Sequence, residues 1–120
     1  MNILILFTKS TSLNYNKFLI IEAFKRNNNL INVSFYEISN YDEFLLHFDI
    51  NKYKNYIFWM HQKIGSYLLT IPEKVELIKL NNIKTIFWMD DLHFPCTEDD
   101  RYNLNLIYKD ERYTNCDLII

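Results

Sequence analysis

The sequence predicts an α/β fold of the Rossmann-like class, with a parallel sheet of about five strands and helices on both faces. Three observations support this prediction. Apolar runs without a polar face alternate with amphipathic segments along the chain, a pattern typical of parallel strands connected by helices. The 120 residues suffice for one compact domain and are too few for two. Hydrophobic residues make up 49% of a chain with one glycine and two prolines, which excludes a disordered or linker-rich protein.

The strands are predicted from short apolar runs that stop at polar residues. They are expected at residues 1–8, 30–36, 55–60, 84–89 and 117–120. The run MNILILFT is apolar on both faces and stops at KSTS, as a fully buried strand would. The second run, LINVSFY, alternates and is therefore expected to have one face that is more polar.

Helices are predicted in the intervals between the strands. They are expected at residues 15–26, 41–48, 72–80 and 101–108. The apolar side of the first helix consists of Leu19, Ile20, Ala23 and Phe24. Asn27 and the two asparagines after it stop this helix, and Pro72 opens the third at a first-turn position.

Charge, hydropathy and cysteine content exclude several classes of protein and of binding partner. A net charge of −2 gives no general attraction to nucleic acid or to a membrane surface. No apolar run exceeds about six residues, whereas a membrane-spanning helix needs roughly 20. Residues 1–7 lack a cationic start and a long enough apolar run, so we do not expect them to act as a secretory signal. Cys96 and Cys116 form neither a disulfide framework nor a zinc motif. We therefore expect a cytoplasmic protein with reduced thiols and no membrane span.

Polar segments follow three of the predicted strands. In open parallel sheets the ligand crevice lies beyond the carboxyl ends of the strands, near the point where the strand order reverses. The candidate site residues are Lys9, Ser10, Thr11 and Ser12 after the first strand, His61 after the third, and Asp90, Asp91 and His93 after the fourth. We expect these three groups to converge in space.

The first group, residues 9–12, offers hydroxyls and one cation. These could bind a sugar hydroxyl, or a phosphate at a helix start. Neither GxGxxG nor GxxxxGK[ST] is present, because the only glycine, Gly65, lies elsewhere. The alternative is a solvated loop in which one hydroxyl caps the following helix.

The Asp90-Asp91 pair and His93 are the candidates for proton transfer. Two adjacent carboxylates repel each other, so one of them can act as a general base. Neighbouring residues of an extended chain point to opposite sides, and we favour Asp91 or His93 as the base. The alternative is that Asp90 caps a turn and Asp91 is solvated. His61 could equally be a hydrogen-bonded strand-end residue.

Trp59 and Trp88 occupy matching positions in two FWM triplets. Burial of these large rings beneath the crevice is the expected role. The alternative is that one indole stacks on a sugar face near the strand end.

The segments MNILILFT, NIKTIFWMDDLHF and NCDLII together resemble the N-terminal Rossmann-like domain of GT-B glycosyltransferases. The resemblance implies that residues 1–120 receive an acceptor such as a glycan hydroxyl and contribute the base. A C-terminal half, absent from these 120 residues, would bind the nucleotide-sugar. Residues 9–12, His61 and the segment 90–93 would face the cleft between the halves. The resemblance requires no metal and no cofactor apart from the nucleotide-sugar co-substrate.

Two alternatives stay open. In a GT-A-like transferase, Asp90 and Asp91 would hold Mn²⁺ or Mg²⁺ on the donor diphosphate, although the pair lacks the usual DxD spacing. A non-enzymatic α/β module would instead dock a basic partner on residues 90–117. Residues 90–120 carry 8 acidic against 3 basic side chains, so this part of the chain is an acidic patch. A receiver-like module is disfavoured, because Lys9 and Ser10 stand where its acidic pair would be.

Overall fold

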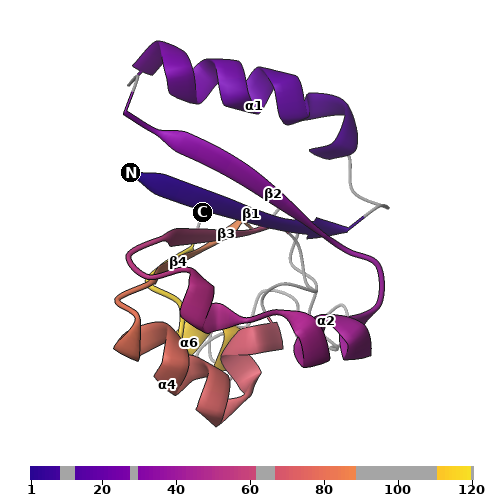
Figure 1. The fold of residues 1–120 in the computed structure, drawn as a ribbon, viewed down its shortest axis with the longest axis vertical. Coiled ribbons are helices and arrows are strands. Elements are labelled where there is room, and N and C mark those ends of the chain that lie inside the picture. Colours follow the sequence, from indigo (N-terminus) through magenta and orange to yellow (C-terminus); the bar gives the residue numbers. More distant parts are fainter. Residues whose placement is uncertain (9–12, 28–29, 62–66, 89–110, 120) are drawn as a thin grey trace, which may run out of the picture.

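The computed structural model describes residues 1–8, 13–27, 30–61, 67–88 and 111–119 (Figure 1). Five parallel strands form one sheet in the order β2-β1-β3-β4-β5. The strands are β1 Asn2–Thr8, β2 Asn32–Ile38, β3 Ile57–His61, β4 Lys84–Trp88 and β5 Leu118–Ile119. The helices are α1 Leu13–Asn27, α2 Tyr41–His47, α4 Pro72–Leu80 and α6 Glu111–Thr114, with 3-10 turns η1 Ile50–Lys52 and η2 Tyr67–Thr70. The predicted α/β class and parallel sheet are confirmed.

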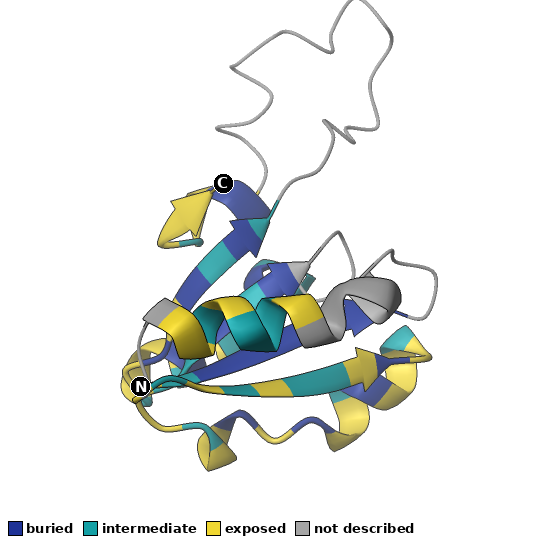
Figure 2. Cartoon of the chain, turned by 90° about the horizontal axis from the view of Figure 1, so that it is seen from above, coloured by how far each residue is buried: buried dark blue, intermediate teal, exposed yellow. Residues whose placement is uncertain are grey.

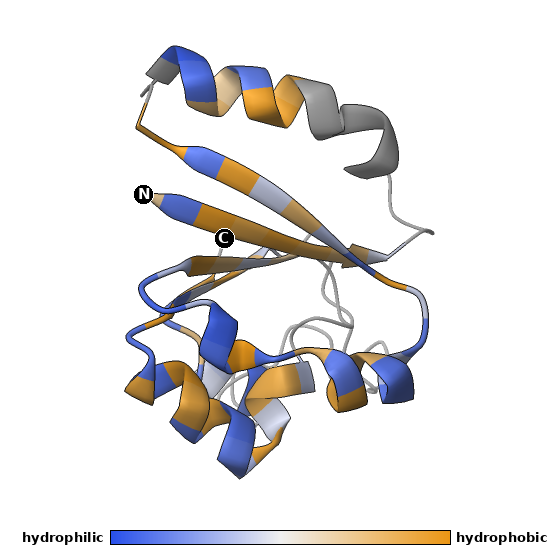
Figure 3. Ribbon diagram, viewed as in Figure 1, coloured by the Kyte–Doolittle hydropathy of each residue, from blue (hydrophilic) through white to orange (hydrophobic). Residues whose placement is uncertain are grey.

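The side chains of β1 divide between two hydrophobic clusters, one on each face of the sheet. Ile3, Ile5 and Phe7 pack against Ile20 and Phe24 of α1, and we call this side of the sheet the α1 face. The next residues along β1 point the other way, toward what we call the opposite face. Successive side chains of a strand alternate, so an unbroken apolar run supplies both clusters at once. Figure 3 shows β1 as almost uniformly apolar, whereas the helices mix apolar and polar residues.

The opposite face holds the larger cluster. Phe58 and Met60 of β3 and Phe87 of β4 pack there with Phe44 of α2 and Ile78 of α4. Figure 1 shows α2, α4 and α6 below the sheet and α1 above it. Most of the buried apolar side chains of the described residues therefore lie between the sheet and α2, α4, α6 and the two 3-10 turns.

The predicted apolar side of the first helix is only partly correct. Ile20 and Phe24 pack on the sheet, but Leu19 is 63% exposed and Ala23 is also exposed. A helix resting on a sheet buries a stripe of residues spaced four apart, and the stripe of α1 passes through Ile20 and Phe24. The helix also begins at Leu13, two residues before the predicted start.

Asparagines organise the amino ends of β3 and β4. Asn55 and Asn82 have left-handed backbone angles, with φ of 63° and 51°, a conformation that asparagine tolerates better than most residues. The Asn82 side-chain amide donates a hydrogen bond of 3.0 Å to the Asn55 side-chain oxygen. The turns that lead into the two neighbouring strands are therefore connected to each other.

Asp117 attaches β5 to β4. Its carboxylate accepts hydrogen bonds from the backbone N–H of Thr85 at 2.8 Å and from the Thr85 hydroxyl at 3.1 Å. The backbone N–H of Asp117 donates to the same hydroxyl at 3.0 Å. These bonds explain why an aspartate precedes the last apolar run, because they set the register that pairs Ile86 with Leu118.

Several elements differ from the predictions. The two 3-10 turns and α6 were not expected, because segments of three or four residues carry no clear periodicity. β2 begins two residues later than predicted and extends to Ile38. The helix predicted at residues 101–108 lies outside the described residues. Within the described ranges, no helix combines the length and the apolar character that crossing a membrane requires.

Candidate functional site

The strand order places a reversal at the centre of the sheet. β1 pairs with β2 on one side and with β3 on the other, and β4 and β5 follow β3 outward. Chain connections therefore leave β1 and β3 in opposite directions at their carboxyl ends. In parallel sheets this arrangement creates a crevice for a ligand at that edge. The candidate site is thus the carboxyl edge of β1, β3 and β4.

The register places the ends of these three strands at nearly one level. Leu6 pairs with Met60, Met60 pairs with Phe87, and His61 pairs with Trp88. Neighbouring strands are about 4.8 Å apart, so the last residues of β1, β3 and β4 lie on one short stretch of the edge. The expectation that the first, third and fourth strands end at a common edge is confirmed.

The predicted site side chains themselves are not described. Lys9, Ser10, Thr11, Ser12, Asp90, Asp91 and His93 lie outside the described residues. His61 is the last residue of β3, and only its backbone is described. The structure therefore shows where the segments that carry these residues begin, and the roles of the side chains stay predictions.

Two indoles lie beside this edge on the α1 face. The ring centroids of Trp59 and Trp88 are 5.5 Å apart, with 33° between the ring planes. Phe24 of α1 contacts Trp59 edge to face at 5.8 Å. The Trp59 Nε1 is buried and finds no hydrogen-bond acceptor among the described residues. Both tryptophans pack against neighbouring rings, but each is only partly buried. The predicted burial of the two rings is therefore correct only in part.

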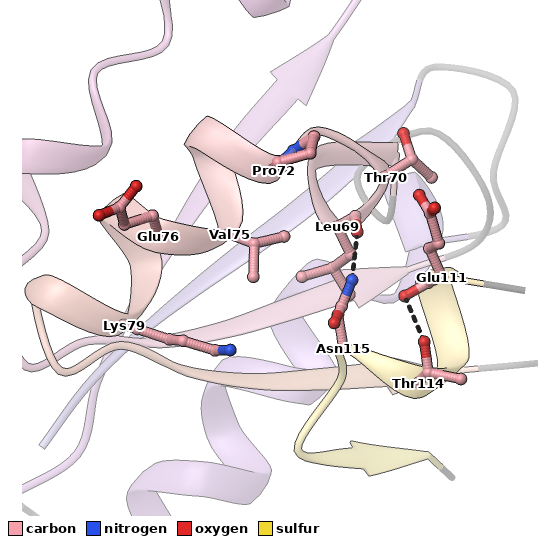
Figure 4. Close-up of a pocket in the computed structure, with 9 residues that line it drawn as sticks. All are labelled: Leu69, Thr70, Pro72, Val75, Glu76, Lys79, Glu111, Thr114 and Asn115. Atoms are coloured by element: carbon pink, nitrogen blue, oxygen red, sulfur yellow. Dashed lines mark hydrogen bonds between the residues drawn. The ribbon is translucent and has the colours of Figure 1, made fainter.

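A concave region lies among the helices that cover the opposite face. It is a hollow of about 480 Å³ between η2, α4 and α6 (Figure 4). The residues that line it are Leu69, Thr70, Pro72, Val75, Glu76, Lys79, Glu111, Thr114 and Asn115. The Asn115 side chain donates to the Leu69 carbonyl at 2.9 Å, and Figure 4 shows the Glu76 carboxylate turned away from the hollow.

The charged groups of this hollow do not form a reactive cluster. Glu76, Lys79 and Glu111 are all exposed, and the Thr114 hydroxyl donates to the backbone of its own helix. No local sequence pattern predicts the hollow, because its walls come from segments about 40 residues apart in the chain. We therefore place the candidate site at the carboxyl edge.

Cys116 is a free thiol whose surroundings do not favour the reactive thiolate form. Burial raises its pKa above the usual thiol value, although backbone and side-chain hydrogen bonds act in the opposite direction. Its sulfur donates to the carbonyls of Leu118 at 3.0 Å and Thr85 at 3.4 Å. A raised pKa reduces the thiolate fraction that would react. Cys116 forms no disulfide with another described residue. Cys96 lies outside the described residues, and the reduced state of both thiols stays a prediction.

Among the described residues, no group of three or more histidine, cysteine, aspartate or glutamate side chains could hold a metal ion. The Asp90-Asp91 pair is not among those residues, so the GT-A-like alternative stays a prediction.

Comparison with protein-family models and with curated proteins finds no match for this chain. The candidate site therefore depends on the sheet topology and on the residues that follow each strand.

Proposed function

We propose that this chain is the acceptor-side domain of a GT-B-like glycosyltransferase. In this proposal residues 1–120 bind an acceptor with a free hydroxyl, such as a glycan, at the carboxyl edge of β1, β3 and β4. The nucleotide-sugar donor binds to a second, C-terminal domain across the cleft. The reaction takes place in the cytoplasm and involves neither nucleic acid nor a membrane span.

The chemistry follows from the residues assigned to that edge. Asp91 or His93 takes the proton of the acceptor hydroxyl. The hydroxyl oxygen attacks the anomeric carbon of the donor sugar, the bond from that carbon to the diphosphate breaks, and the nucleoside diphosphate leaves with the electron pair. Residues 9–12, His61 and Asp90 hydrogen-bond the acceptor hydroxyls. No step requires a metal.

One observation supports this proposal above the others, namely the adjacency of β1, β3 and β4 with their carboxyl ends at one edge. The strand order 2-1-3-4-5 reverses at that place, where doubly wound sheets bind their ligands. Lys9 follows Thr8 directly, and Asp90 comes two residues after Trp88. Residues 9–12, His61 and residues 90–93 therefore follow strands whose carboxyl ends lie at one edge of the sheet, which supports the proposal.

A direct test is a titration of the ¹⁵N-labelled chain with a panel of glycans, followed by NMR. We expect the amide signals of Thr8, His61 and Trp88 to shift with one class of glycan, because these residues end the three strands. Signals of Val75 and Asn115, which line the hollow on the opposite face, serve as the internal control. Shifts confined to that hollow, or no shift with any glycan, would contradict the proposal.

The catalytic assignment needs a separate experiment on the chain combined with its donor-binding half. Asp91→Asn should reduce release of nucleoside diphosphate at least about tenfold and leave the melting temperature nearly unchanged. Glu76→Gln, an exposed change on α4, is the matched control. Unchanged turnover removes Asp91 from the catalytic residues. Loss of activity on chelation of divalent metal would favour the GT-A-like alternative.

A further inference from the structure

The hollow between η2, α4 and α6 continues into a second, smaller one. Besides the hollow of about 480 Å³, a hollow of about 130 Å³ lies further along α4. The two hollows share four lining residues, which are Leu69, Val75, Lys79 and Asn115. They therefore form one groove between α4 and the segment from α6 to β5, which we call the α4–α6 groove.

The floor of the α4–α6 groove is aliphatic. Leu69, Ile78 and Ile83 are buried there, with at most 4% of their surface exposed, and Pro72 and Val75 extend the apolar surface. No aromatic ring is among the described residues that line either hollow. Flat ring ligands such as nucleobases stack on aromatic side chains, so the groove fits aliphatic groups better. The burial pattern of Figure 2 agrees, because the helices that flank the sheet expose one side and bury the other.

The spacing of the two hollows matches alternate residues of an extended peptide. Pro72 of α4 lines only the larger hollow, and Ile78 lines only the smaller. The hollows therefore follow each other along the helix, where one turn advances the chain by about 5.4 Å. Residues i and i+2 of an extended chain point to the same side and are about 6.6 Å apart. A peptide strand can thus place a large side chain in the first hollow and a small one in the second.

Asn115 supplies a polar group where the two hollows meet. Its Nδ2 donates to the Leu69 carbonyl at 2.9 Å, which fixes the orientation of the amide. No described residue donates a hydrogen bond to the Asn115 Oδ1. An extended peptide carries main-chain N–H groups between its side chains, and one of these can donate to this oxygen.

The charges of the groove differ between its two ends. Glu111 lines only the larger hollow, Lys84 lines only the smaller, and Lys79 lines both. Figure 4 shows Lys79 and Glu111 at opposite ends of the larger hollow. Asp117 also lines the smaller hollow, but its carboxylate accepts the two hydrogen bonds from Thr85. The groove therefore favours a basic group at the Glu111 end and an acidic group at the end with the two lysines.

We propose that the α4–α6 groove binds an extended segment of a partner polypeptide. The segment places a large aliphatic side chain in the larger hollow and a small one, two residues along, in the smaller hollow. A basic residue flanks the large side chain, and an acidic residue flanks the small one. This inference concerns the opposite face and does not depend on the glycosyltransferase proposal, which concerns the carboxyl edge.

The test uses two short peptides with serine at every second position. The charge-matched peptide has lysine, leucine, alanine and glutamate in this order at the other positions, and the charge-swapped peptide exchanges the lysine and the glutamate. Binding is measured by fluorescence anisotropy of the labelled peptide, and the NMR signals of Val75 and Asn115 report contact with the groove. We expect the charge-matched peptide to bind about three- to tenfold more tightly.

The double variant Lys79→Glu/Glu111→Lys should reverse this preference, because it exchanges the charges at the two ends of the larger hollow. Lys74→Glu is the matched control, since Lys74 belongs to α4 but lines neither hollow. It should leave the preference unchanged.

Thr114→Phe should weaken binding of the charge-matched peptide at least about tenfold, because the ring would fill the larger hollow. Thr114 is exposed on α6, so the fold should persist, which the melting temperature checks. Leu46→Phe, at an exposed position on α2, is the matched control. Equal binding of the two peptides, failure of both to bind, or binding that Thr114→Phe leaves unchanged overturns the proposal. Peptide-dependent NMR shifts confined to Thr8, His61 and Trp88 also overturn it, because the peptide would then bind at the carboxyl edge.

Discussion

At the residue scale, Asp117 shows how one side chain determines the position of an edge strand. β5 has only two residues, so its own ladder hydrogen bonds contribute little. The carboxylate of Asp117 bonds both polar groups of Thr85, and Thr85 is almost completely buried, with 1% of its surface exposed. This pair replaces the ladder bonds that a longer strand would make.

Asp117→Ala should lower the free energy of unfolding by about 1–3 kcal/mol, because it leaves the Thr85 N–H and hydroxyl without their acceptor. Thr85→Val should cost less than Asp117→Ala, since the backbone N–H of residue 85 still has its acceptor. Urea unfolding followed by tryptophan fluorescence gives both values, with Glu76→Ala on exposed α4 as the control. A cost for Asp117→Ala no larger than that of Glu76→Ala would show that these bonds do not stabilise the fold.

At the element scale, β4 demonstrates how two faces of one strand can differ. Phe87 and Trp88 are adjacent and aromatic, yet they point to opposite faces. Phe87 has 2% of its surface exposed and contacts Tyr113 of α6 with ring centroids 5.3 Å apart. Trp88 contacts Trp59 and stays partly exposed. The FWM triplet does not indicate which of the two aromatic residues is buried, and only the packing shows that they lie on opposite faces.

Phe87→Ala should cost about 3–5 kcal/mol of unfolding free energy, as expected for a large aromatic side chain removed from a core. Trp88→Ala should cost about 1–2 kcal/mol, because less of its surface leaves water on folding. Chemical denaturation monitored by far-UV circular dichroism compares the two variants without depending on Trp88. A larger cost for Trp88→Ala would mean that the α1 face of β4 is more covered than the structure shows.

At the scale of the whole molecule, stability should decrease from the centre of the sheet toward β5. All residues of β1 after Asn2 are buried, and β1 lies between two strands. Both residues of β5 are exposed. The strands nearest the reversal should therefore hold the candidate site on the most rigid part of the fold.

Native-state hydrogen exchange tests this gradient. We expect the amides of Leu4, Ile5 and Leu6 to exchange only through global unfolding, and those of Leu118 and Ile119 to exchange at least about a hundredfold faster through local opening. Equal protection of β1 and β5 would contradict the gradient.

Much of the fold was predictable because its strands and helices depend on residues that are close together in the sequence. Runs such as ILILF and YIFWM are long enough to be strands buried on both faces, and the polar residues after them mark the carboxyl ends. Pro72 predicted the start of α4 correctly, and β1 was predicted to within one residue. The exposed faces of α1 were less predictable, because Leu19 and Ile20 are equally apolar and only their contact with the sheet distinguishes them.

The sequence by itself determined the α/β class, the strands and the polar segments that follow them, because each of these depends on residues close together in the chain. Only the tertiary structure decided that β1 lies between β2 and β3, and that η2, α4 and α6 enclose a hollow. These features depend on which distant segments pair and pack, and the free energy of that pairing comes from burial on both faces of the sheet. The local pattern of apolar and polar residues does not identify a segment dozens of residues away with which a strand or helix packs.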